Sequence, residues 1–123
     1  MRDYAVLRER YLRDGLPTRL GGLAANLGRI RSFAAQGGGD DVVESLLDES
    51  KRFIEWTARD VEIERAAELV LLQIQLARWQ LQWPRIRGAP LARGRMAEEG
   101  GIWSRRLLEM SGLLRSSPEP GVR

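Results

Sequence analysis

The chain has no cysteine and no histidine among its 123 residues, and these two absences exclude several kinds of chemistry. Without cysteine the chain forms no disulfide and offers no thiol nucleophile. Without histidine it cannot build a Ser-His-Asp triad, and zinc or haem sites that use either residue are excluded as well. Lysine is scarce too, since Lys51 is the one lysine and every other basic residue is arginine.

Long hydrophobic runs are also missing. No segment approaches the ~18 consecutive apolar residues of a membrane span, and Met1-Arg2-Asp3-Tyr4 is not followed by the apolar stretch of a secretory signal. We therefore expect a cytoplasmic protein that does not enter a membrane. Hydrophobic residues make up 43% and charged residues 30%, which is typical of one soluble domain, expected over residues 1–115. Residues 116–123 contain two prolines and one glycine and are expected to be a disordered tail.

Apolar residues recur at spacings of three and four along most of the chain, which indicates helices and not strands. We expect a short leading helix at about 2–14, followed by four principal helices at about 18–35, 40–58, 61–83 and 95–114. The connections after residues 36 and 59 are short, and short connections make consecutive helices pack antiparallel. The sequence therefore predicts an all-α fold, an up-and-down four-helix bundle with a short extra N-terminal helix.

The fourth principal helix carries two apolar lines. One line contains Leu69, Leu72, Leu76, Trp79 and Trp83, and the adjacent line contains Ile63, Ala67, Val70, Ile74, Ala77 and Leu81. Together they form an arc wider than one amphipathic face, so we expect this helix to lie centrally and to be surrounded on most sides. We expect Pro84 to end it, with residues 84–94 as a connection, because two prolines and two glycines punctuate that stretch.

A line of small residues marks a candidate interaction groove on the helix at 18–35. Glycine inside a helix costs ~1 kcal/mol relative to alanine, so two glycines on one line suggest that another backbone approaches closely there. That backbone belongs either to a neighbouring helix or to a second protomer. Trp83, at a helix end beside a proline, is expected to be partly exposed and is a further candidate contact residue. The small residues are Gly21, Ala25, Gly28 and Ser32.

The charge is divided unevenly along the chain. Residues 1–39 carry a net charge of +4, residues 40–69 carry −6, residues 70–115 carry +5 and residues 116–123 are neutral. This pattern favours either charge complementarity between neighbouring helices or docking of the acidic face of one protomer on the basic face of another.

The chain contains no motif for catalysis or cofactor binding. Neither G-x-x-x-x-G-K-[S/T] nor G-x-G-x-x-G nor S-x-x-K occurs. Acidic residues pair at a spacing of four, as in Glu64 with Glu68, but such pairs are usually a solvated helix face, and an oxygen-only cation site is a minor alternative. We therefore expect no catalytic residues, no cofactor and no metal ligands.

These observations predict a non-catalytic protein–protein interaction or self-association module, with a protein partner or a homodimer as its assembly. The alternative is a binder of polyanions or nucleic acid, because arginines beside Trp83 are able to grip phosphate and stack on a base. The arginines of that alternative site are Arg85, Arg87, Arg93 and Arg95.

Three short stretches also resemble a known group of proteins. They are Phe53-Ile54-Glu55-Trp56-Thr57-Ala58, Ala66-Ala67-Glu68-Leu69-Val70 and Ile102-Trp103-Ser104. These stretches resemble short, uncharacterised helical proteins of photosynthetic bacteria. The resemblance implies a small cytosolic helical protein and no site residues.

Overall fold

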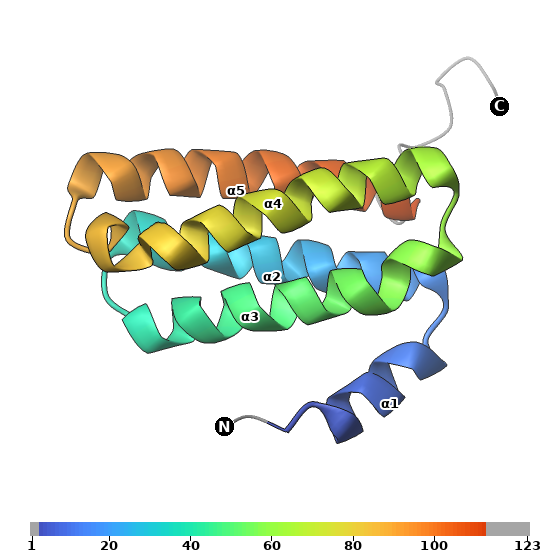
Figure 1. The fold of residues 1–123 in the computed structure, drawn as a ribbon. Helices are drawn as coiled ribbons and strands as arrows, with labels where there is room; N and C mark the ends of the chain where they lie inside the picture. The colour runs from blue at the N-terminus through green and yellow to red at the C-terminus, as the bar shows by residue number, and fades with distance from the viewer. Residues whose placement is uncertain (1–2, 113–123) are drawn as a thin grey trace, which may run out of the picture.

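The computed structural model describes residues 3–112, which form five α-helices and one short 3-10 helix. Figure 1 shows their order along the chain. The elements are α1 (Ala5–Arg13), α2 (Leu16–Gln36), α3 (Asp40–Thr57), η1 (Ala58–Asp60), α4 (Ile63–Ile86) and α5 (Pro90–Ser111).

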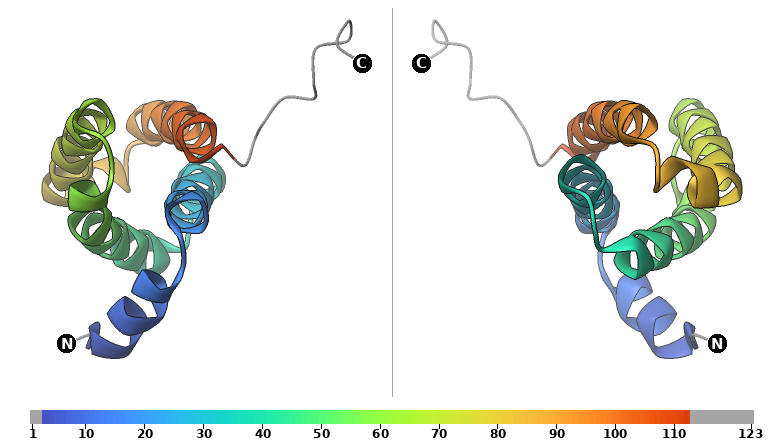
Figure 2. Two further views of the ribbon diagram at one scale, coloured as in Figure 1. Left: turned by 90° about the vertical axis from the view of Figure 1, so that its right-hand side faces the viewer. Right: turned by 90° about the vertical axis from the view of Figure 1, so that its left-hand side faces the viewer.

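The four long helices stand at the corners of a square and run alternately up and down. Seen end-on, the order around the square is α2, α3, α4 and α5, and α1 lies outside it against α3 (Figure 2). The closest pair is α2 and α5, whereas α4 packs mainly on α3. The predicted up-and-down bundle with an extra N-terminal helix is thereby confirmed.

Glycines and prolines set the boundaries of α2 and α3. Pro17 occupies the first turn of α2, where the missing amide hydrogen is not needed. The link to α3 is three glycines with positive φ, and a Cβ on Gly39 would lie 2.5 Å from the Phe33 ring. Position 39 therefore needs glycine both for its backbone conformation and for space.

Leucines of all four long helices fill the interior. The α2–α5 contact is close because small residues line both helices: the Oγ of Ser104 donates a 2.8 Å hydrogen bond to the carbonyl oxygen of Ala24, and a Cβ on Gly100 would lie 3.5 Å from the carbonyl oxygen of Leu27. The largest fully buried side chains are Trp83, Leu20, Leu23, Leu27, Ile30, Leu47, Leu69, Leu72, Leu76, Met96, Leu107 and Val43.

The predicted connection over residues 84–94 is wrong, because helices occupy most of it. Helix α4 continues through Pro84 to Ile86, and α5 begins at Pro90, so residues 87–89 form the link. Pro84 costs α4 one backbone hydrogen bond in its last turn, but burial of Trp83 and Ile86 in the core favours continuing the helix. Pro90 sits in the first turn of α5, a position that suits proline.

The predicted central position of α4 is also wrong. This helix occupies one corner of the square, so only part of its circumference meets other helices (Figure 2). The line through Leu69, Leu72 and Leu76 is buried as expected, whereas Val70 and Ile74 are exposed, because their line lies on the opposite side of the helix and not beside the first. The wide apolar arc thus serves the core on one side and faces outward on the other.

Candidate functional site

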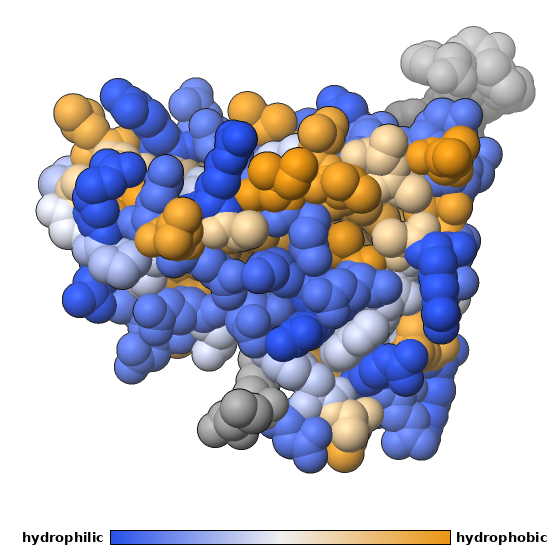
Figure 3. Space-filling view, in the orientation of Figure 1, coloured by the Kyte–Doolittle hydropathy of each residue, from blue (hydrophilic) through white to orange (hydrophobic). Residues whose placement is uncertain are grey.

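Helix α4 presents a continuous apolar stripe to the outside of the bundle. Its large exposed members are Ile63, Val70, Ile74 and Leu81, with exposed fractions of 79%, 53%, 45% and 82%, and Leu71 borders them at 59%. Apolar side chains follow the diagonal path of α4 across the surface in Figure 3, where they form an orange and pale band. We call this surface the α4 face and define it by Ile63, Ala67, Val70, Leu71, Ile74, Ala77 and Leu81.

The α4 face lies opposite the side of the helix that enters the core. Successive residues of an α-helix are turned by about 100°, so residues two apart point to nearly opposite sides. Val70 accordingly precedes the buried Leu72 by two positions, and Ile74 precedes the buried Leu76 by two. One helix therefore carries two parallel apolar seams, of which one is buried by its own chain and one is not.

The spacing along the α4 face is that of a helix-pairing seam. Its members other than Leu71, from Ile63 to Leu81, alternate steps of four and three residues, as do the a and d positions of a heptad. At a rise of 1.5 Å per residue this seam is about 27 Å long. Large contiguous apolar surfaces on soluble proteins are often interaction sites, so the α4 face is the candidate site of this chain.

Polar contacts fix the flanks of α4 to its neighbours and leave the α4 face uncovered. On one flank the Nζ of Lys51 in α3 donates a 2.8 Å hydrogen bond to the side chain of Gln80. On the other flank Arg106 of α5 donates to Glu68 at 2.7 and 2.9 Å. Both contacts lie on the core side of α4, so the α4 face on the other side of the helix points away from the bundle.

The predicted groove of small residues divides between the inside and the outside of the bundle. Gly28 faces α5, and a Cβ there would lie 3.6 Å from the Oγ of Ser104. Ala25 lines a surface hollow beside α1, Ser32 is exposed and Gly21 is half-buried. The close neighbour of Gly28 is thus a helix of the same chain, and the four residues do not form one free face.

Trp83 is not the exposed contact residue that was predicted. It is 1% exposed, and the guanidinium of Arg93 lies 5.2 Å from the centre of its ring. Helix α4 continues beyond Pro84 to Ile86, and Trp83 falls on the core seam one turn after Trp79. The prediction was wrong because it took Pro84 as the end of the helix, whereas α4 ends at Ile86.

Arg93 is buried and fully engaged within the chain. Its guanidinium donates hydrogen bonds to the carbonyl oxygens of Phe33 at 2.8 Å and Ala34 at 3.1 Å in the last turn of α2, and the carbonyl of Phe33 also accepts the backbone N–H of Gly37. Further contacts reach the carbonyl oxygens of Gly38 and Arg87 and the carboxylate of Asp40. Its predicted role as an anion ligand is therefore not what the structure shows.

The other three arginines of the predicted anion site are exposed but do not share a loop. Arg85 lies in the last turn of α4, Arg87 in the link and Arg95 in α5. Arg85 and Arg95 line one surface hollow together with Arg78 and Glu99. A carboxylate in the same hollow lowers the positive potential that a polyanion would meet.

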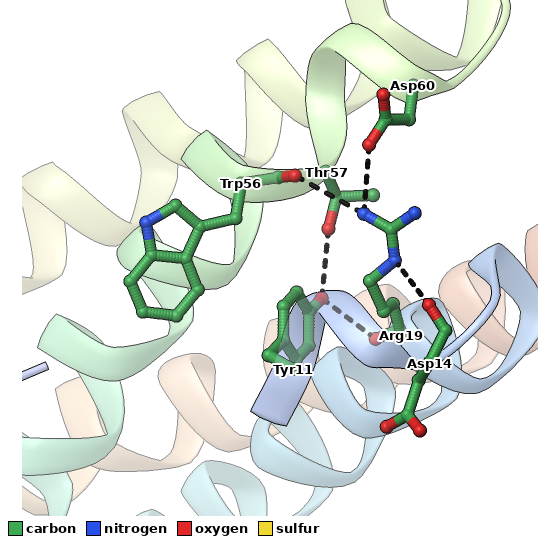
Figure 4. A network of polar contacts seen from close by, with 6 residues as sticks. All are labelled: Tyr11, Asp14, Arg19, Trp56, Thr57 and Asp60. Atoms are coloured by element: carbon green, nitrogen blue, oxygen red, sulfur yellow. Dashed lines mark hydrogen bonds and ion pairs between the residues drawn. The ribbon is translucent and has the colours of Figure 1, made fainter. Parts of the chain in front are cut away.

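A second buried arginine closes the opposite end of the bundle (Figure 4). Arg19 donates to the carbonyl oxygen of Asp14 at 3.0 Å and to the carboxylate of Asp60 at 3.0 Å. Tyr11 of α1 donates to the carbonyl oxygen of Arg19, and its oxygen lies 3.0 Å from the hydroxyl of Thr57. Burial raises the pKa of Tyr11 to about 12, while the hydrogen bond with Thr57 acts in the opposite direction. The network ties α1 to the bundle.

No protein-family model, no curated protein and no solved structure matches the chain. The resemblance to helical proteins of photosynthetic bacteria stays a prediction. Across residues 3–112 no helix is long and apolar enough to cross a membrane, and no three acidic side chains are grouped where a metal ion would bind. The predicted tail at 116–123 lies outside the described residues.

Proposed function

We propose that the protein is a non-catalytic interaction module and that it docks through the α4 face onto a protein that presents an apolar helical seam. The observation that carries this proposal is the uncovered seam from Ile63 to Leu81 on a helix whose opposite seam builds the core. Covering these side chains removes apolar surface from water, which contributes about 25 cal/mol for each Å².

The heptad spacing supports a helix as the partner's contact element. Side chains at alternating steps of three and four interlock with an equally spaced seam on another helix, whereas a flat surface would leave gaps between them. We do not extend the proposal to polyanions, because Arg93 is occupied by carbonyl groups and the other three arginines lie on different elements.

The experiment compares the full chain with Ile74→Glu in an extract of cells that express each at its native level. We expect the full chain to elute well above its 13.9 kDa monomer mass and Ile74→Glu to elute at that mass. The matched control is Val42→Glu on α3, because Val42 is 42% exposed and Ile74 is 45% exposed. The control should elute with the full chain. The proposal is wrong if the full chain itself elutes as a monomer, or if Ile74→Glu leaves the assembly intact.

A further inference from the structure

We propose that the partner at the α4 face is a second copy of this chain, bound with its α4 antiparallel to the first. This inference rests on the proposed function and names the occupant of the same surface. Charge, register and the position of one leucine argue for this arrangement independently of one another.

The apolar seam pairs with itself when two copies of α4 run in opposite directions. In that register Ile63 lies opposite Leu81 of the other copy, Ala67 opposite Ala77, and Val70 opposite Ile74. Each layer matches residues of similar size, and the two alanine layers let the helices approach closely. A twofold axis relates the copies, so every layer occurs twice and the contact closes on itself.

The charges beside the seam are complementary in the same register. Glu64 and Arg78 lie on the same flank of the α4 face, one near each end of the helix. Antiparallel pairing places Glu64 of each copy beside Arg78 of the other, which forms two equivalent ion pairs. The overall charge of the two halves of α4 favours the same pairing. The start of α4 carries two acids, Glu64 and Glu68, and one arginine, whereas its second half carries arginines and no acid.

A parallel arrangement of the same seam is unfavourable for two reasons. It would bring two acidic ends together and two basic ends together, and it would align the helix dipoles in the same direction. It would also leave Leu71, which is 59% exposed, on opposite outer flanks of the pair. In the antiparallel register the two copies of Leu71 meet beside the twofold axis.

The corner position of α4 makes this contact accessible. Helices α3 and α5 are held on the core side of α4 by Lys51 and Arg106, so neither covers the seam. Two bundles can therefore meet corner to corner along α4 while keeping their interiors unchanged.

Charge exchange in the purified full chain tests the arrangement. We expect a dimer with twice the 13.9 kDa monomer mass by sedimentation equilibrium. Glu64→Arg alone and Arg78→Glu alone should each raise the dimer dissociation constant by about tenfold, since each change replaces two attractions with two repulsions. The double variant should return to within about threefold of the original constant. The control Glu62→Arg, which lies off the seam, should leave the constant unchanged.

Cross-linking tests the direction of the helices without relying on charge. Because the chain has no cysteine, Glu64→Cys and Arg78→Cys each carry a single thiol. When the two variants are mixed and treated with a short bifunctional maleimide, we expect the product that joins one of each to dominate. Products that join mainly two identical variants would contradict the antiparallel register.

The outcomes separate this inference from the proposed function. A purified chain that stays monomeric while the extract shows an assembly overturns the second copy and leaves the interaction module standing. The purified chain could also dimerise while the double charge variant has a higher dissociation constant than both single variants, or while identical variants cross-link. Either result overturns the antiparallel arrangement alone. If the chain is monomeric both in the extract and after purification, the interaction module and the second copy are both overturned.

Discussion

Two buried arginines show how this chain uses its most abundant basic residue. Arg19 and Arg93 each bind backbone carbonyl oxygens and one carboxylate, at opposite ends of the bundle. A planar guanidinium with five N–H donors suits such sites better than lysine does, since the free carbonyls at a helix end point in several directions. An arginine-rich composition is thus partly structural here.

Replacing Arg93 should destabilise the fold. Arg93→Met removes the hydrogen bonds that the guanidinium donates to the carbonyls of Phe33 and Ala34 and the contact with the carboxylate of Asp40, so we expect the free energy of unfolding to fall by about 3 kcal/mol. Arg95→Met, two residues further along α5 and exposed, should change it by less than about 0.5 kcal/mol. Chemical denaturation measures both. Equal effects of the two variants would contradict the structural role of Arg93.

Tyr11 gives the bundle a dependence on alkaline pH. Its pKa is about 12 in the folded chain against 10.0 as the ordinary value, so the neutral phenol is favoured by folding. The resulting stability is fully present below pH 10 and is lost as pH rises toward 12, an effect of about 3 kcal/mol at most. Denaturation between pH 9 and 12 should show a slope that Tyr11→Phe lacks. A variant with the same slope would show that other groups cause it.

At the scale of elements, the packing of α2 against α5 depends on glycine. Gly28→Leu should place a bulky side chain against Ser104 and lower the free energy of unfolding by about 2 kcal/mol or more. Gly94→Leu, in α5 with nothing within 4 Å of its Cβ position, should instead raise it by about 0.5–1 kcal/mol through helix propensity. Thermal unfolding followed by circular dichroism compares the two. Similar melting temperatures would contradict the close α2–α5 contact.

Periodicity sufficed to predict the number and order of the helices, but it could not assign α4 its place. Leu72 and Val70 are equally apolar in sequence terms, and only the packing of other helices makes one buried and the other exposed. The sequence did contain a signal for the exposed apolar face. A helix at the corner of a four-helix bundle buries one side, so it cannot bury two heptad lines that lie on opposite sides. The boundaries near Pro84 and Pro90 failed since proline is tolerated in the last and first turns of helices when core contacts favour them.

At the scale of the whole molecule, the uneven charge is partly neutralised inside the chain. Within residues 3–112, ion pairs join the acidic middle segment to the basic flanking segments, among them Arg19 with Asp60, Arg93 with Asp40, and Arg106 with Glu68. Charge complementarity between helices, one of the two alternatives that the sequence left open, is therefore present. The candidate site could not be predicted in the same way, since exposure of the α4 face depends on where every other helix lies.

The most direct test of the account measures whether the α4 face becomes covered when the full chain assembles. Ile74→Cys places a single thiol on this face, and Ala35→Cys places one on an exposed position of α2 as the control. Maleimide labelling is followed under reducing conditions as the chain concentration is raised. We predict that the labelling rate of Ile74→Cys falls by about tenfold across the range in which the chain assembles, while that of Ala35→Cys stays constant. Equal and constant labelling of both variants at every concentration would contradict the claim that two copies of the chain pair through the α4 face.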